Sequence, residues 1–158
     1  MCTFSEITHA CWQPAFAIMQ QTQPDTWSLD TFQQSLNPPN FAMQMLHDTQ
    51  CIGFYIVQTL KTASFTEWNL EEIAVAPSVQ GKGYGRILLK QLLQQALINH
   101  VDDIFLEVRA SNTAAIGLYQ SSGFVQIDVR KNYYPVNSNL CSNATHEDAL
   151  IMRWQRCE

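Results

Sequence analysis

Residues 80–85 of this 158-residue chain read Gln-Gly-Lys-Gly-Tyr-Gly, a composition and spacing that can bind an anion. An apolar run typical of a strand precedes them at residues 73–76, and an amphipathic segment typical of a helix begins near Tyr84. Because glycine has no Cβ, successive backbone N–H groups can converge on one point, and the start of a helix adds positive partial charge. The pattern favours a phosphate or pyrophosphate site, although a plain strand-to-helix connection would also use these glycines.

The spacing of the glycines excludes two common phosphate motifs. A P-loop requires Gly-x-x-x-x-Gly-Lys before Ser or Thr, whereas Gly83 follows Lys82 here. A dinucleotide-binding fingerprint requires Gly-x-Gly-x-x-Gly, and Arg86 occupies the position of its third glycine. The remaining pattern, Gln-x-x-Gly-x-Gly at Gln80, Gly83 and Gly85, resembles the acetyl-coenzyme A signature of the GNAT acetyltransferases.

Thioester aminolysis also needs groups that accept and donate protons, and the sequence offers four candidates. Glu107 lies in the middle of a predicted strand, and its carboxylate can act as a base when partial burial raises its pKa. Tyr119 lies in a predicted short helix, and a phenol can protonate a leaving thiolate whose pKa is about 8.5. Glu71 and Glu72, on the strand before the glycine loop, are rival bases. The ordinary structural explanations are an exposed glutamate at 107 and a core tyrosine at 119.

Hydrophobic periodicity predicts the elements that would position these residues. Helices are predicted at residues 9–21, 28–36, from 84 onward and 112–122, with Ser28 and Asn112 as N-caps and Gly123 as the left-handed residue after the last helix. Strands are predicted at residues 3–7, 41–46, 52–60, 66–76, 104–109, 124–129 and 149–154. A turn is expected at residues 23–25 and a polar surface loop at residues 137–145.

The element order β-α-α-β-β-β-α-β-α-β-β predicts a single α/β domain over residues 1–158, a central mixed sheet of about seven strands with about four flanking helices. A ligand can then lie between adjacent strand ends, where open α/β sheets usually bind ligands. Alternation along residues 104–109 places Glu107 on the face opposite the apolar Leu106 and Val108.

Composition limits the partners that the chain can have. A net charge of −5 and a pI of about 5.2 argue against direct nucleic-acid binding, which needs a basic face, and they favour a cationic partner. The five cysteines contain no Cys-x-x-Cys pair, the four histidines share no spacing, and no metal site is expected. Reduced thiols, no signal-peptide pattern and no apolar run of about 20 residues predict a cytoplasmic protein without membrane association.

Longer matches extend the resemblance over nearly the whole chain and make it more specific. Residues 106–112, 114–116, 118–119, 122–124, 130–135 and 146–152 are similar to the ribosomal-protein-alanine N-acetyltransferases (RimI type). Trp27-Ser28, with Thr31-Phe32, resembles the first acceptor-side helix pair of that family. The chain departs from the family pattern in two places, because residues 136–145 form a longer connection and the sequence before Trp27 matches only loosely.

The resemblance implies a GNAT fold that transfers acetyl from acetyl-CoA to a protein N-terminus, in particular the N-terminal alanine of a basic small-subunit ribosomal protein. It implies Glu107 as general base, Tyr119 as general acid, and Trp27, Tyr133 and Tyr134 at the acceptor groove. The implied coenzyme-binding residues are Ile73, Val75, Gln80, Gly81, Lys82, Gly83, Tyr84, Gly85, Arg86, Asn112 and Tyr119. Other protein N-termini, a lysine or a small amine remain alternative acceptors, and a non-catalytic coenzyme A-binding module is a further alternative.

Overall fold

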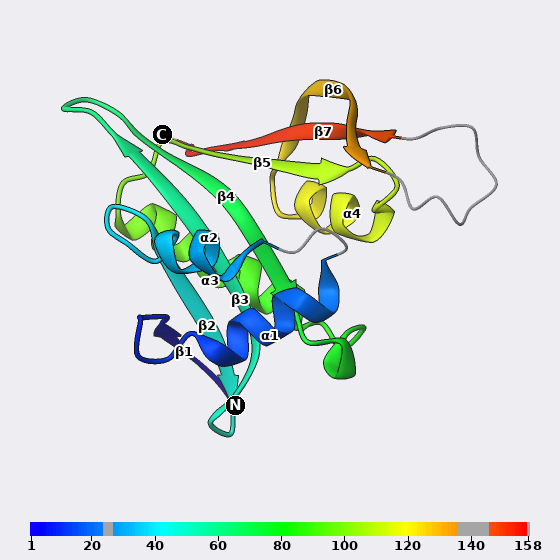
Figure 1. Cartoon of the computed structure of the whole chain (residues 1–158). Helices are drawn as coiled ribbons and strands as arrows, with labels where there is room; N and C mark the ends of the chain where they lie inside the picture. Colours follow the sequence, from blue (N-terminus) through cyan, green and yellow to red (C-terminus); the bar gives the residue numbers. More distant parts are fainter. Residues whose placement is uncertain (24–26, 136–145, 158) are drawn as a thin grey trace.

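One seven-stranded sheet organises the computed structural model, which describes residues 1–23, 27–135 and 146–157 (Figure 1). The strands are β1 (Cys2–Glu6), β2 (Phe41–His47), β3 (Gln50–Lys61), β4 (Thr66–Val75), β5 (Asp103–Arg109), β6 (Val125–Pro135) and β7 (His146–Gln155). The helices are α1 (Gln13–Thr22), α2 (Leu29–Gln34), α3 (Tyr84–Ile98) and α4 (Thr113–Ser121), with a 3₁₀ turn, η1 (Pro77–Val79), before α3. The predicted α/β fold and element order are confirmed.

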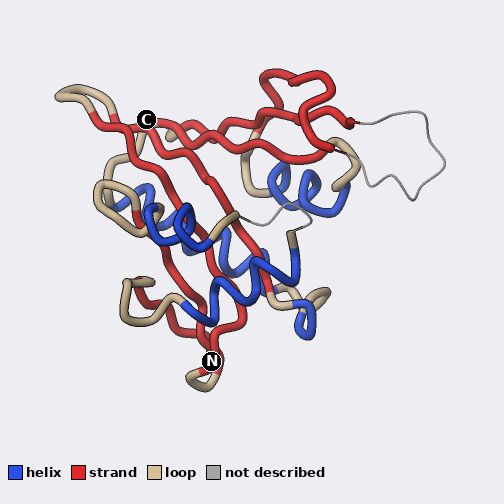
Figure 2. Tube along the Cα trace, viewed as in Figure 1, coloured by secondary structure: helices blue, strands red, loops and turns tan. Residues whose placement is uncertain are grey.

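The strands lie in the spatial order β1-β2-β3-β4-β5-β7-β6. Every neighbouring pair is antiparallel except β4 and β5, which run parallel. Figure 2 shows the strands as one continuous layer with helices on both sides. The parallel pair β4 and β5 therefore needs a crossover connection, and α3 supplies it.

The alternation of side chains along the strands divides the interior into two cores. The larger core lies under α3 and α4, where Leu88, Leu89 and Leu92 pack on strand residues that include Tyr55 and Ile104. The smaller core lies under α1 and α2 and contains Met19, Phe32, Phe54, Ile56 and Ala74. Helices α1 and α2 thus cover the β2–β4 part of one sheet face and leave the same face of β5 and β7 uncovered (Figure 1).

Strands β4 and β5 are paired over only part of their length. Their register runs from Glu67 opposite Asp103 to Leu70 opposite Leu106, and it stops there although both strands continue. At the same point Glu71 is an extra residue against β3, because Val57 lies opposite Leu70 and Ile56 lies opposite Glu72. Such a bulge bends its strand. Beyond it β4 stays with β3 and β5 stays with β7, so a V-shaped opening separates the two strands (Figure 1).

Several local predictions agree with the structure and one does not. The side chains of Ser28 and Asn112 accept N–H hydrogen bonds from Thr31 and Ala115, at 3.2 Å each, and Gly123 has a φ of 101°. The helix predicted at residues 9–21 instead begins at Gln13, because residues 8–11 form a turn closed by the Cys11 N–H to the Thr8 carbonyl at 3.1 Å.

The final strands extend beyond their predicted bounds, to residues 125–135 and 146–155. The expected turn at 23–25 falls partly, and the expected loop at 137–145 entirely, outside the described residues. Among the described residues, no helix is long and apolar enough to cross a membrane.

Candidate active site

The glycine loop connects the end of β4 to the start of α3 in a conformation that requires glycine. Gly81 and Gly83 have φ values of 79° and 87°, and a Cβ added at either position would have no neighbour within 4 Å. Gly83 is the N-cap of α3 and offers no side chain to the free N–H groups of the first helical turn. The Gln80 side chain donates from Nε2 to the Val75 carbonyl at 3.0 Å and so ties the loop to β4. The loop therefore presents an open helix N-terminus that suits an anion.

At Ile73 and Val75, the backbone polar groups of β4 face the opening. The Ala76 N–H donates to the Ile52 carbonyl at 2.8 Å, so alternation directs Ala74 and Ala76 toward β3. The N–H and C=O groups of Ile73 and Val75 therefore point away from β3, into the space between β4 and β5. The Ile73 N–H already bonds the Glu72 carboxylate. The Val75 N–H is directed at the position where an acyl oxygen could be polarised.

The start of α3 is packed closely against β4 and α4. A Cβ at Gly85 would lie 3.5 Å from Leu118 Cδ2 and 4.0 Å from Val75 Cγ2. Arg86 Nη1 donates to Ser121 Oγ at 3.2 Å, which joins α3 to α4. Lys82 is exposed on the loop. The four coenzyme candidates Lys82, Tyr84, Gly85 and Arg86 thus gather around one helix end, outside the pocket described next.

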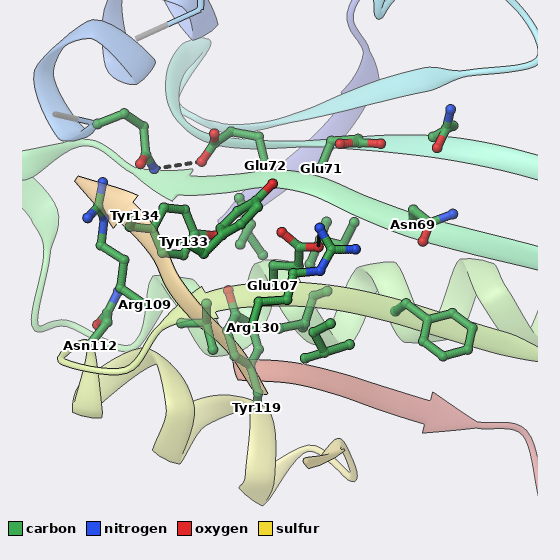
Figure 3. Close-up of a pocket in the computed structure, with 18 of the residues that line it drawn as sticks. Asn69, Glu71, Glu72, Glu107, Arg109, Asn112, Tyr119, Arg130, Tyr133 and Tyr134 are labelled. Carbon is green, nitrogen blue, oxygen red and sulfur yellow. Dashed lines mark hydrogen bonds and ion pairs between the residues drawn. The ribbon is translucent and has the colours of Figure 1, made fainter. Parts of the chain in front are cut away.

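A pocket of about 790 Å³ lies on the face of β4 and β5 that α1 and α2 leave open (Figure 3). Its floor includes Phe105 and Glu107 of β5, with Asn69 and Glu71 of β4 beside them. One wall comes from the α1–α2 side of the molecule and the other from β6. Seven of the residues predicted from the sequence line it: Trp27, Ile73, Glu107, Asn112, Tyr119, Tyr133 and Tyr134. Residues of both β4 and β5 line the pocket, as do Asn112 and Tyr119 at α4.

Glu107 and Tyr119 reach the pocket from different elements. The Glu107 carboxylate projects from β5 as alternation predicts, and its Oε1 lies 3.1 Å from Arg130 Nη1. Tyr119 is 7% exposed, and its ring packs against Phe124 with centroids 5.7 Å apart. Burial, and then the charge of Glu72, raise the pKa of Tyr119 above its ordinary value. In the described part of the chain no residue hydrogen-bonds its hydroxyl, which therefore remains available to a ligand in the opening.

The two rival carboxylates also line the pocket but differ from Glu107 in their partners. Glu72 Oε1 accepts a 2.6 Å hydrogen bond from Gln23 Nε2 at the end of α1 (Figure 3). Burial raises the pKa of Glu72 to about 8, so this side chain is largely protonated at neutral pH. Burial, and then the negative charge of Glu107, raise the pKa of Glu71. The structure therefore brings all three carboxyl groups to one pocket, and Glu107 alone of the three carries a guanidinium partner among the described residues.

The β6 wall owes its shape to an insertion in the β6–β7 register. Arg130 lies opposite Ala149 and Tyr134 lies opposite Glu147, so three residues of β6 face the single residue Asp148. The Asp148 carboxylate closes this bulge by accepting from the Asn132 N–H at 3.0 Å and from Lys131 Nζ at 3.1 Å. Those hydrogen bonds lower the pKa of Asp148, which keeps the anchor charged at neutral pH. The bulge turns Tyr133 and Tyr134 over the pocket.

Cations and aromatic rings alternate along this wall. The guanidinium of Arg109 lies 4.4 Å from the Tyr134 ring centroid, and that of Arg130 lies 5.2 Å from the Tyr133 centroid. The two tyrosine rings pack edge to face with centroids 5.0 Å apart. Arg109 Nη1 forms an ion pair with Glu147 Oε1 at 3.2 Å. Arg109 and Arg130 both belong to the sequence motifs, but no role was predicted for either. Their contacts depend on strand register, which the spacing of residues within a motif does not reveal.

The fold and the site define a transferase with a glycine loop at the start of α3 and a carboxylate-lined pocket on β4 and β5. Residues 4–124 match the acetyltransferase (GNAT) family, and the chain belongs to this family. The ribosomal protein bS18-alanine N-acetyltransferase of Haemophilus influenzae is 35% identical over 144 residues, which cover 91% of this chain and 95% of that protein. The resemblance inferred from the motifs is thus confirmed.

Solved structures give the same result. The crystal structure of the ribosomal-protein-S18-alanine N-acetyltransferase from Escherichia coli is 34% identical, with a TM-score of 0.86 over 98% of this chain and 94% of that one. A GNAT family acetyltransferase from Elizabethkingia anophelis with acetyl-CoA bound is 23% identical, with a TM-score of 0.77 over 98% of each chain. The second likeness concerns the fold alone.

At the glycine loop, we expect Gly83→Asp to abolish measurable binding of acetyl-CoA while the fold is retained. Aspartate and asparagine meet the same backbone strain at a φ of 87°, in space that is otherwise open, so the two variants differ in charge and not in strain. Gly83→Asn is the matched control, because it has the same size without the charge. Isothermal titration should show the Asp variant binding at least about tenfold more weakly than the Asn variant. Wild-type affinity in a folded Asp variant would exclude a phosphate site here.

The buried carboxyl of Glu72 should make stability depend on pH. Its pKa is raised from 4.5 to about 8 in the fold, so the folded protein binds a proton there that the unfolded chain has lost. Wild-type stability should therefore fall relative to Glu72→Gln as pH rises from about 4.5 to about 8, with a slope of at most about 1.4 kcal/mol per pH unit. Urea unfolding of both proteins across this range tests the expectation. Parallel pH dependences would show that Glu72 is not buried as described.

Proposed function

We propose that this enzyme transfers the acetyl group of acetyl-CoA to the α-amine of the N-terminal alanine of ribosomal protein bS18. The observation that carries the proposal is the opening between β4 and β5. Residues of both strands line the pocket that contains Glu107 and Tyr119, and the glycine loop lies between β4 and α3. The relatives of known specificity support the choice of acceptor, because they match this chain over almost its full length. The cytoplasm, where ribosomal proteins are made, is the compartment in which we expect the reaction.

The coenzyme is proposed to enter from the α3–α4 side. Its pyrophosphate would bind the N–H groups of the loop at Gly81 and Gly83 and of the first turn of α3, with Lys82 and Arg86 near the phosphates. Its thioester arm would follow the backbone of Ile73 and Val75, whose polar groups are directed into the opening. In that position the Val75 N–H would donate to the thioester oxygen and stabilise the charge that develops there. Asn112 and Tyr119 would face the sulfur end.

The acceptor is proposed to enter from the α1–α2 side, between Trp27 and the tyrosines of β6. Its amine nitrogen would attack the thioester carbon and lose a proton to Glu107, forming the C–N bond of the amide. The C–S bond would break, and Tyr119 would give its proton to the departing thiolate. The raised pKa of Tyr119 means that this phenol is fully protonated, and therefore able to donate, at neutral pH.

Two physical features favour a peptide N-terminus over a lysine. An α-amine has a pKa of about 7.7–8.0, so a fraction is neutral at physiological pH, whereas a lysine amine with a pKa of about 10.4 is almost wholly charged. A single carboxylate can therefore complete deprotonation of the α-amine more readily. The pocket lining also carries four carboxyl groups, Glu67, Glu71, Glu72 and Glu107, against the two guanidiniums of Arg109 and Arg130, and three of the four remain after the largely protonated Glu72 is left out. This excess suits an acceptor with basic residues after its terminus.

We expect Glu107→Gln and Tyr119→Phe each to lower turnover by about 10²–10⁴-fold, the usual contribution of one positioned proton-transfer group. Affinity for acetyl-CoA should change little in the Glu107 variant, which lies on the acceptor side. Glu71→Gln and Glu72→Gln are the matched controls from β4. Wild-type rates in Glu107→Gln, together with a collapse in either control, would move the base to β4.

The acceptor assignment predicts that an alanine-initiated peptide with basic residues in its first positions is acetylated only at its N-terminus. Intact-mass and fragment-ion spectrometry of the product locate the acetyl group. Blocking the terminus should remove all product even when lysines remain, and bulky first residues should slow the reaction because the amine must reach into the opening. A blocked peptide with an internal lysine that reacts faster would replace the alanine assignment with a lysine one. Absence of turnover on every amine would indicate a coenzyme-binding module.

A further inference from the structure

Arg130 places a fixed positive charge on the proposed base. Its Nη1 lies 3.1 Å from Glu107 Oε1, and its guanidinium lies 5.2 Å from the Tyr133 ring centroid. To make this contact, the side chain reaches from β6 across β7 to β5, since β7 lies between them in the sheet. The β7 residue opposite Arg130 is Ala149, whose small side chain leaves the path open. Figure 3 shows Arg130 directed to Glu107 inside the pocket.

The acidic lining creates a conflict that this charge can resolve. Carboxylates attract a cationic N-terminus, but they also stabilise the ammonium form of the amine, which has no lone pair with which to attack. An acceptor held among Glu71, Glu107 and their neighbours would therefore bind well and react slowly. A positive charge close to the nitrogen has the opposite effect, because it disfavours the ammonium form. Arg130 is the guanidinium that contacts Glu107, and Arg109 is held instead by Glu147.

We propose that Arg130 keeps the acceptor amine neutral at Glu107, by occupying one carboxylate oxygen and leaving the other to receive the proton. The inference rests on the proposed function of this pocket and adds a residue that the transfer requires. Arg130 acts on the amine through its charge and through its hold on Glu107, so it is a positioning residue. A guanidinium suits this task because it stays charged at every pH at which the enzyme works.

The remaining charged and titratable groups around the amine position come from four elements. Glu67, Glu71 and Glu72 lie on β4, Arg109 on β5, Tyr119 on α4, and Tyr133 and Tyr134 on β6. Glu72 is largely protonated at neutral pH, and burial raises the pKa of Tyr119 and of Tyr134, so these three groups add little charge there. All these groups are the same in the variants used below, and the comparison therefore isolates the charge at position 130.

The test compares Arg130→Gln with Arg130→Lys, using kcat and KM for the alanine-initiated peptide from about pH 6 to about pH 9.5 at saturating acetyl-CoA. At pH 6–7 the Gln variant should be about tenfold slower, the effect of a one-unit rise in the pKa of the bound amine. The deficit should shrink to about twofold or less near pH 9, where the amine is neutral without help. Lysine restores the charge and should recover most of the rate.

Arg156→Gln is the matched control. It also removes a guanidinium paired with a carboxylate, since Arg156 lies 2.9 Å from Asp102, and neither residue lines the pocket. Its pH profile should follow that of the wild type. Acetyl-CoA titration and thermal melting of each variant establish that the fold and coenzyme site are intact.

The outcomes separate this inference from the proposed function. A deficit in Arg130→Gln that is the same at every pH, or that lysine does not relieve, overturns the charge role and leaves the acceptor assignment standing. A wild type that acetylates a lysine peptide or a small amine instead overturns the acceptor assignment, and the same profile on that amine still tests Arg130. If the wild type acetylates no amine, both proposals fall.

Discussion

The early end of the hydrogen-bonded pairing between β4 and β5 is the constraint on which the rest of the structure depends. After Leu70 and Leu106 the two parallel strands separate, and the backbone at Val75 points into a gap instead of a neighbouring strand. Backbone polar groups inside a protein need partners, so a gap of this kind is stable only where water or a ligand can enter. The Glu71 bulge, the glycine loop and the uncovered face of β5 are all arranged around it.

The gap also explains why the two sides of the sheet carry different chemistry. Backbone groups and a helix N-terminus dominate the α3 side, where they can bind phosphate and polarise a carbonyl without side-chain charges. Carboxylates, guanidiniums and tyrosines dominate the pocket on the other side. An anion at the glycine loop and a cation in the pocket would each meet complementary charge.

Local patterns predicted the parts of this arrangement that depend on neighbours in the sequence. The positive φ angle of Gly123, capping by Ser28 and Asn112, and the outward face of Glu107 all follow from residue type and alternation. The predicted start of α1 was wrong. The turn at residues 8–11 competes with a helix through backbone hydrogen bonds, which hydrophobic spacing does not reveal. The roles assigned to the site residues stay predictions.

The features that escaped prediction depend on register between strands distant in the sequence. The Glu71 bulge follows from its pairing with β3, and the contact between Arg130 and Glu107 depends on β7 lying between β6 and β5. Neither could be read from the motif that contains the residue. The resemblance implied Tyr133 and Tyr134 at an acceptor groove, and both line the pocket, but their stacking with Arg109 and Arg130 required the fold.

The anchoring of the β6 bulge by Asp148 has a consequence for how this chain can vary. The carboxylate holds Lys131 and Asn132 from a position on β7, so the bulge is closed by residues on both sides of the long connection at 136–145. The orientation of the tyrosine rings is then set by the two strands and not by the number of residues that join them. Insertions in that connection can therefore leave the groups beside Glu107 in their places. In evolutionary terms, the length of the connection is free to diverge while this wall of the pocket is insulated from that divergence.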